Sequence, residues 1–308
     1  MKSVSFFTLL ACGLILGTVA RAADSSITVD NQTGYILAKD KENDKRQIGS
    51  LTKIATAMVV LDWVDASHSD LGAMVAVPQE ALAAGGVNPV GLMVGDEISL
   101  RDLLYGALMA SDNVCATVLA YHVGSKLNNP HHLPPVQNFV TQMNALSRIN
   151  GMRHTLFLNP AGMDNFEGQL PYSTAADVAR LTRYAYTKAA FKFYVSQKSR
   201  ELHARRGGSE ISIAIESTNQ LLGQQGIDGV KTGRTSHAGD CVVLSSSRSS
   251  ESVKKGDEVL VTPRRIITVL LGSSDRFGEG LSKINSGWMI YDQWAAKGRP
   301  SHKSETVQ

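Results

Sequence analysis

Three short groups of residues in this sequence have the types and the spacing that nucleophilic catalysis needs. In the first group, Ser50 and Lys53 stand three residues apart at the start of an apolar stretch. Residues with this spacing share one face of a helix, so the hydroxyl lies beside the amine. Burial among apolar neighbours lowers the pKa of the lysine, so that the neutral amine can accept the serine proton, while N–H groups at the helix start face a developing oxyanion. Alone, the pair is weak evidence, because an N-cap serine followed by an ordinary lysine has the same pattern.

The second group is Ser111-Asp112-Asn113, which lies between two apolar stretches. A short non-helical link at this place can direct Ser111 and Asn113 into one cleft while Asp112 turns away. All three residue types are also favoured at helix N-caps, so capping explains the group when it stands alone.

The third group is Lys231-Thr232-Gly233 on a predicted strand. A strand edge beside the nucleophile can pair with an extended peptide, while the lysine adds positive charge and the glycine allows close approach. An ordinary edge strand with a protective lysine is the alternative.

The rest of the sequence predicts the elements that hold these groups. Helical spacing of apolar residues predicts helices over 51–64, 100–110, 114–123, 136–146, 174–190 and 281–294, the first buried on all sides. β-Branched runs bounded by turn residues predict strands over 27–30, 35–38, 230–235, 241–246 and 266–271, with an exposed hairpin tip over 247–263. This order indicates an α+β fold in which a helical lobe is inserted between segments of an antiparallel sheet.

The first 22 residues have the pattern of a secretory leader. Lys2 precedes an apolar run over 4–17 and an A-x-A site that ends at Ala22, where we expect cleavage and export. The run is shorter than a membrane span needs, and an uncleaved anchor is the alternative. Loss of Lys2 and Arg21 lowers the net charge from +3 to +1, which argues against a nucleic-acid partner.

Two cysteines, Cys115 and Cys241, remain once the leader with Cys12 is removed. An oxidising compartment permits a disulfide between them, but both lie in apolar stretches where a small buried side chain is the simpler interpretation. The sequence has no H-E-x-x-H pattern, and we expect neither a metal site nor a cofactor.

In combination, the three groups follow the order found in penicillin-binding proteins and class A β-lactamases. From Ile27 to about Trp294 the chain resembles low-molecular-mass penicillin-binding proteins of the D-alanyl-D-alanine carboxypeptidase and endopeptidase family. The similarity extends to the N-terminal hairpin and to the segments 159–168, 172–178 and 227–239. It implies a β-lactamase/DD-peptidase-like catalytic domain over 23–297, followed by a polar tail at 298–308.

The resemblance implies roles for four catalytic residues. Ser50 is the acylated nucleophile and Lys53 is its general base. Ser111 relays a proton to the leaving amine, and Asn113 holds the substrate amide.

The resemblance also implies a substrate-binding set. Lys231 tunes the electrostatics of the catalytic groups, Thr232 meets the substrate carboxylate, and Gly233 belongs to the strand beside the peptide. The backbone N–H of Arg234, with that of the nucleophile, forms the oxyanion hole; the Arg234 side chain either contacts an acidic stem or is solvated. Arg276 falls where the family places a carboxylate-binding arginine, although an ordinary surface arginine is the alternative.

The implied substrates are peptidoglycan stem peptides, with β-lactam antibiotics as covalent inhibitors. We expect a carboxypeptidase; an endopeptidase that cuts cross-links is the first alternative. A β-lactamase comes next, but Glu167 lacks the arrangement that class A enzymes use for deacylation. A non-catalytic binding module is expected to lose a catalytic position, and none is missing. Few residues follow the last predicted helix, so we expect a periplasmic or extracytoplasmic protein without a stable membrane anchor.

Overall fold

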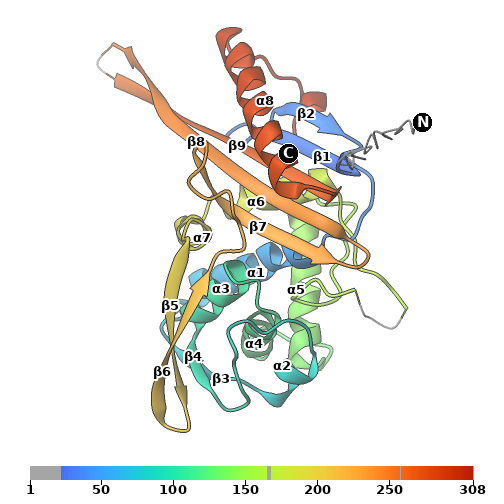
Figure 1. Cartoon of the computed structure of the whole chain (residues 1–308), viewed down its shortest axis with the longest axis vertical. Coiled ribbons are helices and arrows are strands. Elements are labelled where there is room, and N and C mark those ends of the chain that lie inside the picture. The colour runs from blue at the N-terminus through green and yellow to red at the C-terminus, as the bar shows by residue number, and fades with distance from the viewer. Residues whose placement is uncertain (1–21, 165–167, 257, 308) are drawn as a thin grey trace, which may run out of the picture.

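The computed structural model describes residues 22–164, 168–256 and 258–307, so nearly all of the expected leader lies outside the described residues. Its centre is a five-stranded antiparallel sheet in the order β2-β1-β9-β8-β7 (Figure 1). The strands are β1 (Ser25–Asp30), β2 (Ile36–Asp40), β7 (Ile227–Thr235), β8 (Gly239–Lys255) and β9 (Glu258–Ser273). Ile27 of β1 lies opposite Val269 of β9, so distant parts of the chain share one sheet. This confirms the α+β fold with an inserted helical lobe.

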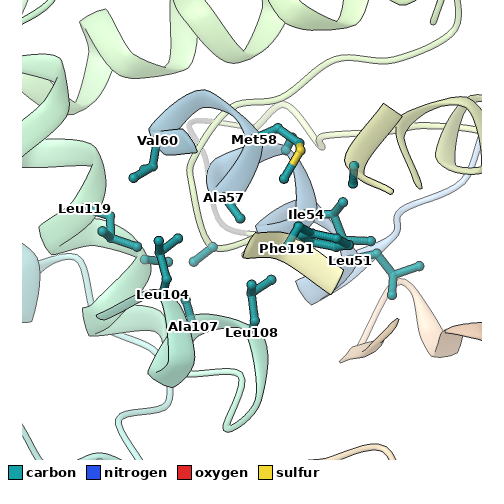
Figure 2. Packing of buried hydrophobic residues seen from close by; sticks show 14 of the residues in the cluster. Leu51, Ile54, Ala57, Met58, Val60, Leu104, Ala107, Leu108, Leu119 and Phe191 are labelled. Carbon is teal, nitrogen blue, oxygen red and sulfur yellow. The ribbon is translucent and has the colours of Figure 1, made fainter. Parts of the chain in front are cut away.

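The helical lobe is organised around α1 (Lys53–Ser67), in which residues 53–61 are all buried. Figure 2 shows Ile54 and Met58 of this helix packed among side chains that include Leu104 and Phe191. The surrounding helices are α2 (Gln79–Ala83), α3 (Leu100–Leu108), α4 (Asn113–Gly124), α5 (Pro135–Ile149), α6 (Ala175–Ala185) and α7 (Ala189–Val195). Each large apolar side chain buried here contributes about 1.5–3 kcal/mol, so the core holds the start of α1 firmly. The prediction of a centrally buried helix is confirmed.

The closing helix α8 (Arg276–Ala296) covers one face of the sheet. Trp288 is buried and donates from Nε1 to Ser246 Oγ on β8 at 2.9 Å. The tail beyond this helix packs more closely than its polar composition predicts. Val307 is 2% exposed, and its N–H donates to the Gly34 carbonyl at 2.9 Å.

A second antiparallel sheet, in the order β3-β4-β5-β6, was not expected from the sequence. Its strands are β3 (Met74–Ala76), β4 (Glu97–Ser99), β5 (Ser199–Arg206) and β6 (Ser209–Glu216). β5 is mostly polar and buries only Leu202 and Ala204 well, so it carries little strand signal. The turn between β5 and β6 is Gly207-Gly208, both with positive φ, and this glycine pair is a hairpin signal that the prediction overlooked.

The prediction of a single helix over 174–190 is wrong near its C-terminal end, because α6 ends at Ala185 and α7 begins at Ala189. The chain is extended at Lys188, whose amine forms ion pairs with Asp62 and Asp65 of α1 at 2.7 and 2.8 Å. No glycine or proline marks this break, so tertiary contacts override the helical pattern. At its start α6 is capped by Thr174, whose hydroxyl accepts from the Asp177 N–H at 3.1 Å.

The expected hairpin tip over 247–263 is confirmed, because β8 and β9 continue past the sheet as a two-stranded ribbon (Figure 1). Val253 and Leu260 face each other across the ribbon and are 60% and 61% exposed. Among the described residues, no helix is both long and apolar enough to cross a membrane.

Candidate active site

Ser50 and Lys53 meet at the start of α1. A 3-10 turn over Gly49–Thr52 precedes the helix and contains Ser50, and Lys53 is the first residue of α1. The Lys53 Nζ lies 2.9 Å from the Ser50 Oγ. The spacing of three residues therefore brings the hydroxyl and the amine into hydrogen-bond contact, as the sequence predicts.

Lys53 is fully buried, and its amine contacts three oxygens. Besides Ser50 Oγ, Nζ donates to Asn113 Oδ1 at 2.7 Å and to the Ala161 carbonyl at 2.9 Å. Burial, opposed in part by the charge of Asp112, lowers the pKa of Lys53 from 10.5 to about 7. Two of the three oxygens belong to amide groups that can only accept a hydrogen. In the neutral amine the two hydrogens therefore face these oxygens, and the lone pair faces Ser50.

The second sequence group combines capping and site positioning. Asp112 caps α4, accepting from the Cys115 N–H at 2.8 Å and from the Val90 N–H at 2.9 Å, so its carboxylate binds backbone groups. Asn113 follows as the first residue of α4 and reaches Lys53. Ser111 has a φ of 62° and is half-buried, and among the described residues its hydroxyl forms no hydrogen bond.

The Ala161 carbonyl is a site group that the sequence reasoning missed. It lies in a tight turn held by Asn159, whose Oδ1 accepts from the N–H groups of Ala161, Gly162 and Met163 at 3.1, 2.7 and 3.0 Å. This turn aims the carbonyl at Lys53. The Asn-Pro-Ala-Gly pattern at 159–162 was the available signal, although it identifies a turn and not its distant partner.

Gly162 lets this turn lie against the 3-10 turn that contains Ser50. Its φ is +82°, and a Cβ there would lie 1.9 Å from the Gly49 carbonyl oxygen. We expect Gly162→Ala to lower the free energy of unfolding by more than about 2 kcal/mol and to slow acylation, because the Ala161 carbonyl must move.

Gly208 offers a matched control for that substitution. Its φ is +84°, but a Cβ there meets nothing within 4 Å. Gly208→Ala is expected to cost only the left-handed backbone penalty of about 1–2 kcal/mol and to leave acylation unchanged. Denaturant unfolding and acylation rates measured on both variants check this; equal effects in the two would contradict it.

The third group lies on β7, directly against the 3-10 turn that contains Ser50. A Cβ on Gly233 would lie 2.7 Å from the Ile48 carbonyl and 3.2 Å from the Ser50 nitrogen. A Cβ on Gly49 would lie 3.3 Å from the Arg234 nitrogen. Glycines on both sides therefore bring the backbone N–H groups of Ser50 and Arg234 to the same region of the site.

Lys231 and Thr232 are both buried on β7. The Lys231 amine donates to the Thr232 carbonyl at 2.9 Å. Burial, together with the charges of Lys53 and Arg276, lowers the pKa of Lys231 well below its usual value. The Thr232 hydroxyl donates to Thr218 Oγ1 at 2.7 Å, so it is already oriented before any substrate binds.

Two arginines share Asp240 beside the third group. Arg276 donates to the Gly233 carbonyl at 3.1 Å and lies 3.4 Å from Asp240 Oδ1. Arg234 Nε lies 3.4 Å from the same oxygen, but its side chain is 77% exposed. Arg276 thus contacts β7 at the third group.

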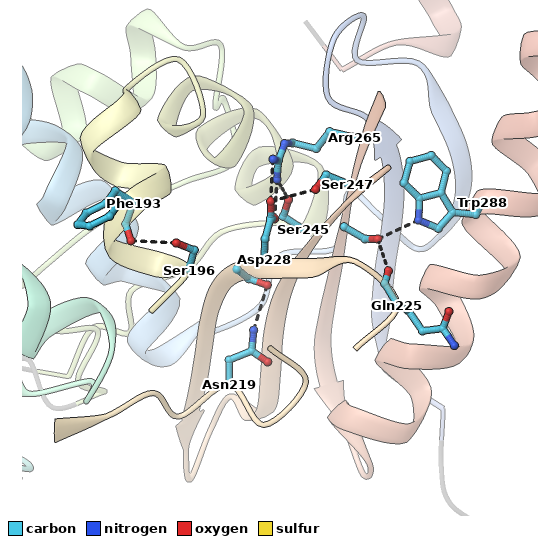
Figure 3. Close-up of polar contacts among 11 residues, drawn as sticks. Phe193, Ser196, Asn219, Gln225, Asp228, Ser245, Ser247, Arg265 and Trp288 are labelled. Atoms are coloured by element: carbon cyan, nitrogen blue, oxygen red, sulfur yellow. Dashed lines mark hydrogen bonds and ion pairs between the residues drawn. The ribbon is translucent and has the colours of Figure 1, made fainter. Parts of the chain in front are cut away.

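A polar network anchors β7 just before Lys231 (Figure 3). Arg265 binds both carboxylate oxygens of Asp228 at 2.6 and 2.7 Å and also contacts Ser245. Asn219 Nδ2 donates to the Gly229 carbonyl at 3.0 Å. The bidentate ion pair of Arg265 with Asp228 and the hydrogen bond from the Asn219 side chain therefore hold the first residues of β7 in place.

Neither cysteine forms a disulfide in this structure. Cys115 and Cys241 are free and buried, so the disulfide that the sequence left open is absent. Glu167 lies outside the described residues. Among the described residues, no cluster of three His, Cys, Asp or Glu side chains could hold a metal ion.

The α+β fold and the contacts of Lys53 with Ser50 and Asn113 are consistent with the DD-peptidase class that the sequence resembles. Residues 17–255 match the peptidase S11 family, described as D-alanyl-D-alanine carboxypeptidase, and the chain therefore belongs to that family. The D-alanyl-D-alanine carboxypeptidase DacF of Bacillus subtilis is 27% identical over 258 residues, covering 83% of this chain and 59% of DacF. The D-alanyl-D-alanine endopeptidase of Escherichia coli is 32% identical over 230 residues, covering 72% of this chain and 66% of the relative.

The solved structure of the Streptomyces K15 DD-transpeptidase confirms the fold. It aligns with a TM-score of 0.74 at 27% sequence identity, covering 87% of this chain and 97% of that chain. The chain spans about three fifths of the length of DacF, since the match covers 59% of it.

Proposed function

We propose that the protein is a serine-type D-Ala-D-Ala carboxypeptidase that acts on peptidoglycan stem peptides through an acyl-enzyme on Ser50. One observation carries the proposal. The buried Lys53 amine contacts Ser50 Oγ, Asn113 Oδ1 and the Ala161 carbonyl, and its pKa is about 7. This is the environment that a general base for a serine nucleophile requires.

Acylation begins when Ser50 Oγ attacks the carbonyl carbon of the penultimate D-Ala. The hydroxyl proton passes to the Lys53 lone pair as the O–C bond forms. The backbone N–H groups of Ser50 and Arg234 stabilise the resulting oxyanion. The C–N bond then breaks, and the leaving amine of the terminal D-Ala takes a proton through Ser111. Water hydrolyses the ester in the second half of the reaction and regenerates Ser50.

The substrate backbone is proposed to lie along β7 and to place its free carboxylate near Thr232 and Arg276. Asn113 holds the amide on the opposite side. Lys231 tunes the electrostatics of the catalytic groups, because it lies close enough to Lys53 for the charges of the two amines to disfavour each other.

β-Lactam antibiotics are proposed to acylate the same serine. Their strained amide offers a carbonyl to Ser50 Oγ, and the ring amine stays tethered after the C–N bond breaks. The tethered amine remains in the site after acylation, so we expect the adduct to persist.

The chain is proposed to work outside the cytoplasm, with residues 1–22 as a cleaved leader, 23–297 as the catalytic domain and 298–308 as the tail. The leader pattern supports export. The tail then serves to cover the sheet end, since Val307 is buried against the β1–β2 turn.

An endopeptidase that cuts cross-links is the second candidate, favoured by the 32% identity to the Escherichia coli endopeptidase. Incubating the purified protein with a pentapeptide muropeptide and with a cross-linked dimer, followed by mass spectrometry, separates the two. Release of D-Ala alone is the expected result. Monomers formed from the dimer would establish the endopeptidase instead, and absence of product from both substrates would reject a peptidase.

A further inference from the structure

Two turns that carry different parts of the site meet at a side-chain pair outside it. Asp164 Oδ2 accepts a hydrogen bond from His237 Nδ1 at 3.0 Å and from the His237 backbone N–H at 3.2 Å. Asp164 follows the turn whose Ala161 carbonyl accepts from Lys53, and His237 lies in the turn that joins β7 to β8. We propose that Asp164 and His237 form a positioning pair, which fixes the general base relative to the substrate-binding strand. This inference rests on the proposed peptidase function.

The 3-10 turn that contains Ser50 lies between the Asn159 turn and the end of β7, where the turn that carries His237 begins. On one side, a Cβ on Gly162 would lie 1.9 Å from the Gly49 carbonyl oxygen. On the other side, a Cβ on Gly49 would lie 3.3 Å from the Arg234 nitrogen. The backbones approach too closely for a Cβ atom to fit without movement, so we expect a shift of the Asn159 turn or of the end of β7 to move Ser50 relative to its base or its oxyanion donors. A direct bond between these two segments limits such shifts.

The burial of the pair argues against a purely stabilising role. Asp164 is 8% exposed, whereas the His237 side chain is 54% exposed. Asp164 Oδ1 is buried without a hydrogen-bond partner among the described residues, which costs stability. A half-exposed ion pair returns little of that cost. A contribution to the free energy of folding therefore does not explain the presence of an aspartate at position 164.

The neutral and the charged imidazole can both form the contact. The Ser236 hydroxyl is a second polar neighbour of Nδ1, at 3.3 Å, but the carboxylate is closer and can only accept. The Nδ1 hydrogen therefore points to Asp164 in either state. Asparagine at position 237 carries an amide nitrogen at the place of Nδ1 and can form the same bond.

The test separates binding of penicillin from the acylation step by following adduct formation against penicillin concentration. Asp164→Ala is expected to lower the acylation rate constant about tenfold while the binding constant stays the same and the melting temperature does not fall. His237→Ala lowers the rate less, because its backbone N–H still reaches Asp164, and it adds nothing in the Asp164→Ala background. His237→Asn restores the rate.

Asp292→Ala is the matched control. It also removes an acidic partner from an ion pair, that of Arg248, but Asp292 lies near the C-terminal end of α8. It is expected to leave both constants unchanged. Wild-type acylation rates in Asp164→Ala and His237→Ala would overturn the positioning role, and so would a loss that His237→Asn fails to restore. A wild-type protein that forms no adduct would overturn the proposed function itself, and the positioning role with it.

Discussion

Exchange of Lys53 for arginine is expected to lower the rate of acylation by penicillin about 10³-fold. Arginine preserves the positive charge and can donate to Asn113 Oδ1 and the Ala161 carbonyl, but it keeps its proton at every accessible pH. The variant therefore retains hydrogen-bond donors at this position and loses the lone pair that faces Ser50. A fluorescent penicillin, quenched at successive times and separated on a gel, measures the rate.

The same base predicts how the wild-type rate depends on pH. The pKa of Lys53 is lowered to about 7, so the amine is protonated and inactive below this pH and neutral above it. The acylation rate is expected to rise through pH 7 and then to level off, and this inflection is expected to be absent in Lys53→Arg. Lys188→Arg, which alters a lysine paired with Asp62 and Asp65, serves as the control and keeps the wild-type profile. A Lys53→Arg variant with the wild-type inflection would show that another group is the base.

Local spacing made part of this site predictable. Ser50 and Lys53 are three residues apart, and a helix brings such residues together wherever it lies in a protein. Ser99 and Asp102 are also three residues apart, and the Ser99 hydroxyl accepts from the Asp102 N–H at 3.0 Å at the start of α3. In both cases the information lies within one turn of helix. Lys231 could be placed on a strand by the same kind of local pattern.

Backbone groups that come from distant segments could not be predicted. The Ala161 carbonyl accepts from Lys53, which is 108 residues away in the sequence. Every residue has a backbone carbonyl, so the residue type at position 161 does not indicate this role. The contact of Asp164 with His237 spans 73 residues and depends on two turns whose positions the core determines. Residue types alone give no reason to pair these positions.

The elements that the sequence analysis missed have a similar cause. β5 pairs with β4, with Ile98 opposite Ala204, and this pairing makes a polar segment into a strand. The break between α6 and α7 places Lys188 against α1, where Asp62 and Asp65 bind it. Propensity acts over a few residues, whereas these features depend on partners that only the folded chain brings near.

Replacement of Ser50 by alanine is expected to abolish the covalent adduct with penicillin, as seen by intact-protein mass spectrometry. Acylation needs an oxygen at this position, and the neighbouring groups that could receive an acyl chain are arranged as base or donors. Ser111→Ala is the matched control: it also removes one hydroxyl, but it is expected to form the adduct more slowly, because the relay of a proton to the leaving amine is impaired while the nucleophile remains.

The fold and non-covalent binding are expected to survive in Ser50→Ala. The Ser50 side chain is half-buried, and its hydroxyl contacts the Lys53 amine. Removing it leaves the Lys53 amine bound to Asn113 and Ala161, so the melting temperature stays near that of the wild type. Excess penicillin is still expected to raise this melting temperature, because a ligand that binds the folded state stabilises it. An adduct of penicillin mass on Ser50→Ala would show that another residue is the nucleophile. Loss of the adduct together with the thermal shift would mean that the alanine disturbs the binding site, and Ser50→Cys, which restores a nucleophile of similar size, would then separate the two effects.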